Sequence, residues 1–151
     1  MFNIQVSRVI NADIESVFAV LTDHANYQRF RGIDASVVIK NGKEDANGVG
    51  AIRVITAGRH VLTEKITAFE YPTRFDYKII QSSPLPYEHE LGQVRLEQHH
   101  EGTSVVWRSK GRIKVPIFGR LLFDKSIQKN GARAFGSILK QVEQATTKPT
   151  N

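Results

Sequence analysis

The sequence predicts an α+β fold in which a seven-stranded antiparallel sheet curls around one long C-terminal helix. Between residues 33 and 114, short strand-like segments follow one another with only turn signals between them, which is typical of an antiparallel meander. Between residues 117 and 145, apolar residues recur at helical spacing. Strands that alternate with helices, as a parallel sheet would require, are not seen in this pattern.

The N-terminal part predicts one strand and two short helices. Residues 2–10 alternate between apolar and polar side chains, as a half-buried strand does. Asp13 is a suitable N-cap for a first helix. The apolar face of that helix has the spacing i, i+3, i+4, i+7 and comprises Ile14, Val17, Phe18 and Leu21. A second short helix is expected to begin at Asp23 and to carry Tyr27 and Phe30 on neighbouring turns.

Six further strands are expected from residue 33 onward, because glycine, proline and asparagine interrupt the apolar pattern at short intervals. The interruptions lie at residues 41–48, 57–58, 71–73, 84–86 and 99–103.

A long helix is expected to complete the fold. Its apolar stripe comprises Phe123, Ile127, Gly131, Ala134, Phe135, Ile138, Leu139 and Val142. Glycine inside a helix costs about 1 kcal/mol relative to alanine, so Gly131 predicts either a kink or a close approach to another element. No composition shift suggests a linker, and we expect a single domain over residues 1–146 and a disordered tail over 147–151.

Composition limits the class of protein. The chain has 151 residues, of which 40% are hydrophobic and 24% charged, as in ordinary globular proteins. No apolar run approaches the roughly 20 residues of a membrane-spanning helix, and the first residues do not resemble a signal peptide. We therefore expect a cytoplasmic protein without stable membrane insertion. The absence of cysteine excludes disulfides, thiolate metal sites and cysteine nucleophiles.

The net charge of +6 is concentrated in one segment. Its cations are Arg108, Lys110, Arg112, Lys114, Arg120, Lys125, Lys129 and Arg133. They are either a solvated outer face, which is the common role of such residues, or a docking surface for an acidic partner. No nucleic-acid-binding signature is present, so nucleic acid is not an expected partner.

Alternation along the last strand predicts a hollow behind the sheet. Val105, Trp107, Ser109, Gly111 and Ile113 share one face, and the intervening cations share the other. Because Ser109 and Gly111 are too small to fill a core, we expect free space beside Trp107.

Neighbouring strands place polar groups on the same inner face. Extending the alternation of Val94 and Leu96 backwards, in the absence of a bulge at Gly92, places Glu90 and Glu88 inward. The same reasoning places Glu64 and Tyr77 inward. Arg53 lies in a strand that is apolar on both faces, so alternation leaves two orientations open. It faces either solvent or a cavity in which Glu64 can pair with it.

Five short segments stand out, namely Gly-Val-Gly-Ala-Ile-Arg at 48–53, Leu-Thr-Glu-Lys-Ile at 62–66, Tyr-Pro-Thr-Arg-Phe-Asp-Tyr at 71–77, Ser-Pro-Leu-Pro at 83–86 and Gly-Thr-Ser-Val-Val-Trp at 102–107. Together with the order of the elements, they resemble the START-like helix-grip superfamily (SRPBCC), and in particular its polyketide cyclase/dehydrase and lipid-transport branch. The resemblance implies a sheet that grips the C-terminal helix around a cavity for lipophilic small molecules. It also favours a cavity-facing Arg53, Glu64 and Tyr77. Phe30 stands where the family often has tryptophan.

No motif predicts a metal or cofactor. The Gly-Val-Gly at 48–50 precedes a strand, whereas a phosphate-binding loop precedes a helix. Tyr-Glu-His-Glu at 87–90 and His-His at 99–100 lack the spacing of metal ligands. Serine-nucleophile motifs are also missing.

The predicted ligand-binding residues are Phe30, Arg53, Glu64, Tyr77, Glu90, Trp107, Phe123, Ile127 and Phe135. Such a site favours binding or carriage of a lipophilic small molecule, with acidic molecules among the candidates. The alternatives are a cyclase- or dehydratase-type enzyme on an aromatic or polyketide-like substrate, and an interaction protein that uses its basic segment. An enzyme would use Glu64 or Tyr77 as general acid or base and Arg53 to stabilise developing charge. A purely structural cross-strand pair of Arg53 and Glu64 is also open.

Overall fold

The structure, a computed structural model, describes residues 1–147, without the side chains of residues 117, 118, 120 and 121. The predicted tail beyond residue 147 and the Arg120 side chain therefore lie outside the described residues. The elements are β1 (Phe2–Ile10), α1 (Ile14–Leu21), η1 (His24–Arg29), β2 (Ala35–Lys40), β3 (Ile52–Ala57), β4 (His60–Glu70), β5 (Arg74–Ser83), β6 (Tyr87–His99), β7 (Gly102–Ile113) and α2 (Ile117–Thr146).

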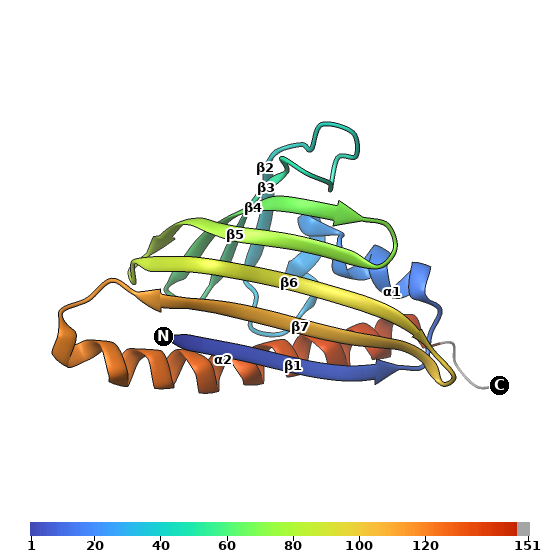
Figure 1. Cartoon of the computed structure of the whole chain (residues 1–151). Helices are drawn as coiled ribbons and strands as arrows, with labels where there is room; N and C mark the ends of the chain where they lie inside the picture. The colour runs from blue at the N-terminus through green and yellow to red at the C-terminus, as the bar shows by residue number, and fades with distance from the viewer. Residues whose placement is uncertain (148–151) are drawn as a thin grey trace.

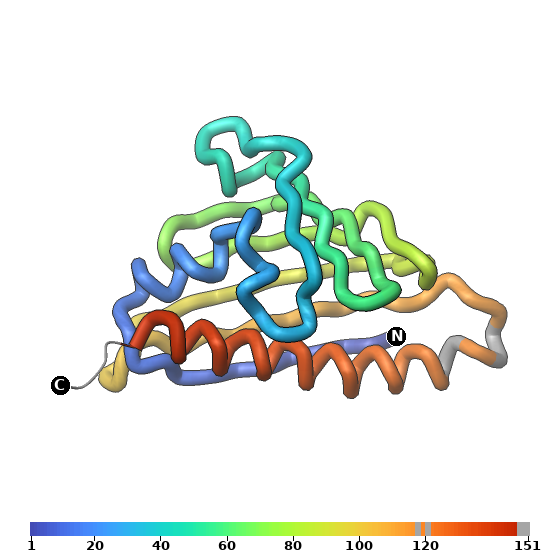
Figure 2. The backbone as a smooth tube through the Cα atoms, turned by 180° about the vertical axis from the view of Figure 1, so that it is seen from behind, coloured from blue at the N-terminus to red at the C-terminus, as the bar shows by residue number. Residues whose placement is uncertain are grey.

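The strands form one seven-stranded sheet in the order β1-β7-β6-β5-β4-β3-β2, and each strand pairs antiparallel with its neighbours. Helix α2 runs along one face of this sheet (Figure 1), and the reverse view shows α1 and η1 on the same side (Figure 2). The sheet is open, with β1 and β2 at its edges. The predicted α+β helix-grip fold is confirmed.

The two short helices follow the sequence pattern. Asp13 caps α1 by accepting a hydrogen bond from the backbone N–H of Ser16 at 3.0 Å, and the predicted apolar face of α1 is buried. The second helix, η1, is a 3₁₀ helix with Tyr27 inside it and Phe30 at its C-terminal end. Both rings are buried and meet edge to face, with 5.2 Å between their centroids.

Helix α2 continues through Gly131 without interruption. A Cβ atom at this position would lie 2.4 Å from Cδ1 of Ile4 in β1. Of the two explanations that the sequence left open, close approach to another element is therefore the one that the structure supports.

Strand β6 contains a bulge that the alternation did not reveal. The register shifts between His89 and Leu91, so that His89 is buried on the inner face. Glu90 instead lies outside, with its carboxylate 3.5 Å from Nζ of Lys110, and Glu88 accepts a hydrogen bond from Arg112. The predicted inward orientation of Glu88 and Glu90 was wrong, because the extra residue reverses the alternation of those before it.

The cations of the basic segment divide between two sides of the molecule. Arg108, Lys110 and Arg112 project from the face of β7 that is turned away from α2. Lys125 and Lys129 are exposed on α2, which covers the opposite face of the sheet (Figure 1). These five cations therefore lie on two surfaces of the molecule.

Gly92 provides the space that the ring of Tyr77 occupies. The two residues are paired partners on β6 and β5. A Cβ atom on Gly92 would lie 2.5 Å from two carbons of that ring. This is closer than two non-bonded carbon atoms approach one another. The ring therefore lies flat across β6 and carries the Tyr77 hydroxyl toward β7, where it meets Trp107.

We expect Gly92→Ala to destabilise the protein by about 1–3 kcal/mol, because the added methyl group overpacks the core against Tyr77. The matched control is Gly136→Ala in α2, where a Cβ atom would make an ordinary 3.9 Å contact with Val6. That variant should be stabilised by up to about 1 kcal/mol through helix propensity. Urea unfolding measures both, and a Gly92→Ala variant as stable as the wild type would contradict this packing.

Candidate functional site

A cavity of about 490 Å³ lies between the inner face of the sheet and α2. Its walls are mainly apolar and aromatic. The apolar and aromatic lining residues include Phe2, Ile4, Tyr27, Ile33, Ile55, Leu62, Ile79, Leu85, Tyr87, Trp107, Phe123, Ile127, Phe135 and Ile138. This space lies on the side of the sheet where the small residues of β7 predicted a hollow, and Ser109 lies in its wall. Gly111 does not line it, because the ring of Phe2 and the backbone of β6 lie against that position.

Most of the predicted site residues come together around this cavity. Those that line it are Arg53, Glu64, Tyr77, Trp107, Phe123, Ile127 and Phe135. Phe30 does not line it, because its side chain is turned into the core, where it supports the ring of Tyr27. Glu90 does not line it either, because the bulge in β6 turns it to the outer face.

Arg53 faces the cavity and forms a buried ion pair with Glu64. The two residues are directly opposite one another on β3 and β4. Nε of Arg53 donates to Oε2 of Glu64 at 2.8 Å, and the side chains are only 2% and 8% exposed. Burial of a charged group costs several kcal/mol unless a partner compensates it. Each of the two side chains therefore stabilises the buried charge of the other.

His24 is a second partner of Arg53 that the sequence did not indicate. A guanidinium group can only donate hydrogen bonds, so Nδ1 of His24, at 2.9 Å from Nη1 of Arg53, must accept one. The proton of the imidazole is then on Nε2, which donates to the backbone oxygen of Asn47 at 2.8 Å. Burial, assisted by the charge of Arg53, lowers the pKa of His24 to about 3. His24 is therefore neutral at physiological pH.

Two tyrosine rings complete the surroundings of the guanidinium. Cζ of Arg53 lies 4.5 Å from the ring centroid of Tyr27 and 5.6 Å from that of Tyr77, within the range of cation–π attraction. The hydroxyl of Tyr27 donates to the backbone oxygen of Leu21. Arg53 is thus held by an anion, a neutral imidazole and two aromatic faces.

The hydroxyl of Tyr77 is held by Trp107. The indole Nε1–H donates to it at 2.9 Å, and the indole ring stacks on Phe135 of α2 with 4.2 Å between centroids and an angle of 8°. Burial raises the pKa of Tyr77 above its ordinary value. At neutral pH this phenol retains its proton, so it can donate a hydrogen bond but cannot act as a general base.

His89 and Ser109 form another polar contact at the cavity wall. Nδ1 of His89 accepts from the backbone N–H of Ile79 at 3.0 Å, so its proton is on Nε2, which lies 2.9 Å from Oγ of Ser109. Burial, with a smaller effect from Lys78, lowers the pKa of His89 to about 4. Sequence reasoning missed this pair because the bulge at Glu90 brings His89 inward.

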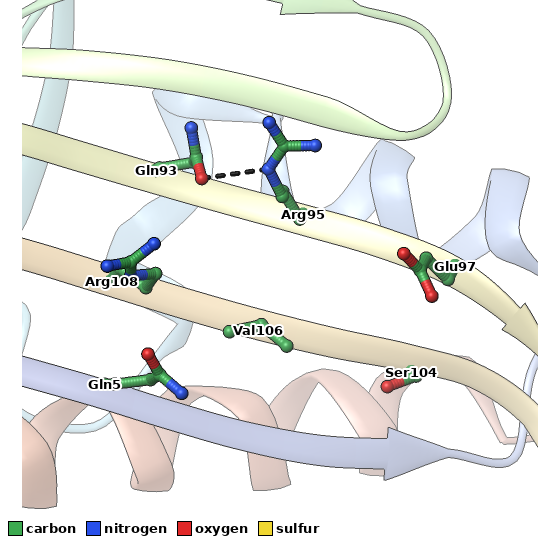
Figure 3. Close-up of a pocket in the computed structure, with 7 residues that line it drawn as sticks. All are labelled: Gln5, Gln93, Arg95, Glu97, Ser104, Val106 and Arg108. Atoms are coloured by element: carbon green, nitrogen blue, oxygen red, sulfur yellow. Dashed lines mark hydrogen bonds between the residues drawn. The ribbon is translucent and has the colours of Figure 1, made fainter.

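A second depression lies on the outer face of the sheet (Figure 3). It is lined by side chains of β1, β6 and β7, namely Gln5, Gln93, Arg95, Glu97, Ser104, Val106 and Arg108. Nε of Arg95 donates to Oε1 of Gln93 at 2.9 Å. All of its lining residues except Val106 are polar or charged, and no aromatic ring is among them, so the cavity beneath α2 is the better candidate for a small-molecule site.

Within residues 1–147, one group of potential metal ligands is found, comprising His99, His100 and Glu101. These residues are consecutive, belong to the end of β6 and the turn after it, and do not line the cavity. In the same part of the chain, no helix has the length and apolar character needed to cross a membrane.

Comparison with known proteins identifies the family. The chain matches the family described as polyketide cyclase / dehydrase and lipid transport over residues 1–145, and it belongs to that family. This agrees with the resemblance of the short segments noted in the sequence. Among curated proteins, none matches the chain.

Solved structures share the fold at low sequence identity. A START superfamily protein from Mycobacterium smegmatis has a TM-score of 0.78 at 9% identity, with 97% of each chain covered. A protein from Thermus thermophilus has a TM-score of 0.73 at 19% identity, with 94% of each chain covered. The di-domain ARO/CYC StfQ from the steffimycin biosynthetic pathway has a TM-score of 0.74 at 15% identity, with 95% of this chain and 49% of that chain covered.

The neutral state of His24 predicts a specific pH dependence of stability. Below its ordinary pKa of 6.5, the unfolded chain binds a proton that the folded chain excludes until about pH 3. The contribution of His24 is therefore fully present above pH 6.5 and is lost progressively on acidification, by about 1.4 kcal/mol per pH unit.

We expect His24→Gln to reduce the slope of unfolding free energy against pH by this amount between pH 6 and 4.5. His100→Gln, which removes an exposed imidazole, is the matched control for the loss of a histidine. Denaturant unfolding at a series of pH values measures the slope. Equal slopes in the wild type and His24→Gln would show that His24 is not held neutral.

Proposed function

We propose that this protein binds and carries a lipophilic small molecule in the cavity between the sheet and α2. The observation that supports this most strongly is the cavity itself, whose mainly apolar wall contains a few fixed polar groups. Ligand pockets commonly combine these features at volumes of about 300–1,000 Å³, and the volume here falls within that range. Membership of a family that includes lipid transport is consistent with the proposal.

The state of the polar groups favours binding over catalysis. A general base works best when its pKa lies near the operating pH. The pKa values of His24 and His89 are lowered to about 3 and about 4, and that of Tyr77 is raised. Glu64 is held by the guanidinium of Arg53. These groups are therefore suited to orienting a ligand through charge and hydrogen bonds.

Ligand binding can be followed through Trp107, which is the only tryptophan of the chain and lines the cavity. Titration with decylubiquinone, oleic acid and 2-naphthoic acid should give saturable quenching with at least one of them. Ile127→Glu should lower that affinity at least tenfold, because it places a carboxylate in the apolar wall.

Gln128→Glu is the matched control, since it adds the same charge to the same helix at an exposed position outside the lining. It should bind as the wild type does. Absence of quenching by every probe, or equal affinity in Ile127→Glu and the wild type, would contradict the proposal.

A cyclase- or dehydratase-type activity is the second candidate, and two observations support it. One is the family, whose description includes cyclases and dehydrases, and the other is the buried Arg53–Glu64 pair in the cavity wall. In that case Glu64 would move a proton while Arg53 stabilised developing negative charge. Small molecules that co-purify with the Glu64→Gln variant should then lose water or cyclise when wild-type protein is added. A molecule returned unchanged by the wild type would favour carriage.

A further inference from the structure

Two residues that carry hydroxyl groups lie on one row of paired residues across the sheet, at the cavity wall. Tyr77 on β5 pairs with Gly92 on β6, and Gly92 pairs with Ser109 on β7. Because the Tyr77 ring lies across Gly92, its hydroxyl reaches the inner face of β7, where it meets Trp107, two residues before Ser109. Both side chains line the cavity.

The hydroxyl of Tyr77 can donate a hydrogen bond to a ligand. Its oxygen accepts from Trp107 Nε1–H, and an indole N–H can only donate. In the described part of the chain, no acceptor receives the phenolic hydrogen in return. The phenol also keeps this proton at neutral pH, because burial raises the pKa of Tyr77.

The hydroxyl of Ser109 can also donate a hydrogen bond to a ligand. Nδ1 of His89 accepts from the backbone N–H of Ile79, so the imidazole proton is on Nε2 and Nε2–H must donate to Oγ of Ser109. Ser109 is consequently an acceptor toward His89, and its own hydrogen has no partner among residues 1–147. His89 acts here as a positioning residue, because its tautomer decides the direction of the serine hydrogen bond.

The charge at this wall is already balanced. The guanidinium of Arg53 pairs with Glu64, and the remaining basic side chains of the lining, Arg59 and His60, are exposed in the β3–β4 turn. A carboxylate placed beside Tyr77 and Ser109 would be desolvated without an unpaired cation to compensate it. A neutral group with oxygen lone pairs has no such cost.

We infer that Tyr77 and Ser109 are the specificity-determining residues of the cavity, and that they select a neutral ligand carrying a carbonyl oxygen, such as a ketone or quinone. A carbonyl oxygen has two lone pairs and no hydrogen, so it satisfies both donors. The inference rests on the proposed binding function, and it replaces the broader expectation that included acidic ligands.

The test compares 9-fluorenone with fluorene, which has the same ring system without the oxygen. Tyr77→Phe and Ser109→Ala should each weaken fluorenone binding by about tenfold, the usual effect of one lost hydrogen bond to a buried donor, and should leave fluorene affinity unchanged within about twofold. Isothermal titration calorimetry measures both. The carbonyl stretching frequency of bound fluorenone should also be higher in Tyr77→Phe than in the wild type.

The matched controls are Tyr71→Phe, at an exposed tyrosine, and Ser104→Ala, on the outer face of β7. Both should bind the two probes as the wild type does. An equal loss of fluorene and fluorenone in the site variants, or 9-fluorenecarboxylate binding to the wild type as tightly as fluorenone, would overturn the inference and leave the binding function standing. Failure of the wild type to bind fluorenone would overturn the inference, whereas the proposed function would fall only if the three probes named above also gave no quenching of Trp107.

Discussion

The buried ion pair between Arg53 and Glu64 joins η1, β3, β4 and β5 at the cavity wall. Both charges are almost fully removed from water, and an unpaired charge there would cost several kcal/mol. The register of β3 and β4 places the two side chains opposite one another. Tyr27 from η1 and Tyr77 from β5 then pack their rings against the guanidinium. The helix and the three strands are thereby held at one point.

Because Glu64 neutralises the charge of Arg53, the rest of the cavity wall can be mainly apolar. Helix α2 covers the inner face of the sheet through Phe135, which stacks on Trp107, and through Gly131, which lets the helix approach β1. Trp107 in turn holds the hydroxyl of Tyr77. The result is a mainly hydrophobic space in which hydrogen-bond donors have fixed positions, a combination that suits a lipophilic ligand with a polar oxygen.

Local sequence patterns predicted the order of the elements and most of the cavity, because helix and strand periodicities depend on near neighbours. The orientation of Arg53 could not be predicted from alternation alone, since Ile52, Val54 and Ile55 make both faces of β3 apolar. The structure shows that Arg53 faces the cavity, where it pairs with Glu64. Glu90 was misplaced because a bulge depends on pairing across strands. His24 could not be found, because its contact with Arg53 joins residues that are distant in the chain.

The most direct test of this account is a double-mutant cycle on the ion pair, with Arg53→Met and Glu64→Leu made singly and together. Each single variant should lose about 3–5 kcal/mol of unfolding free energy, because it leaves an unpaired charge in the core. The double variant should lose much less than the sum, with a coupling of at least about 2 kcal/mol. Urea unfolding measures all four proteins. Additive losses would show that the two charges do not depend on one another and would contradict the account.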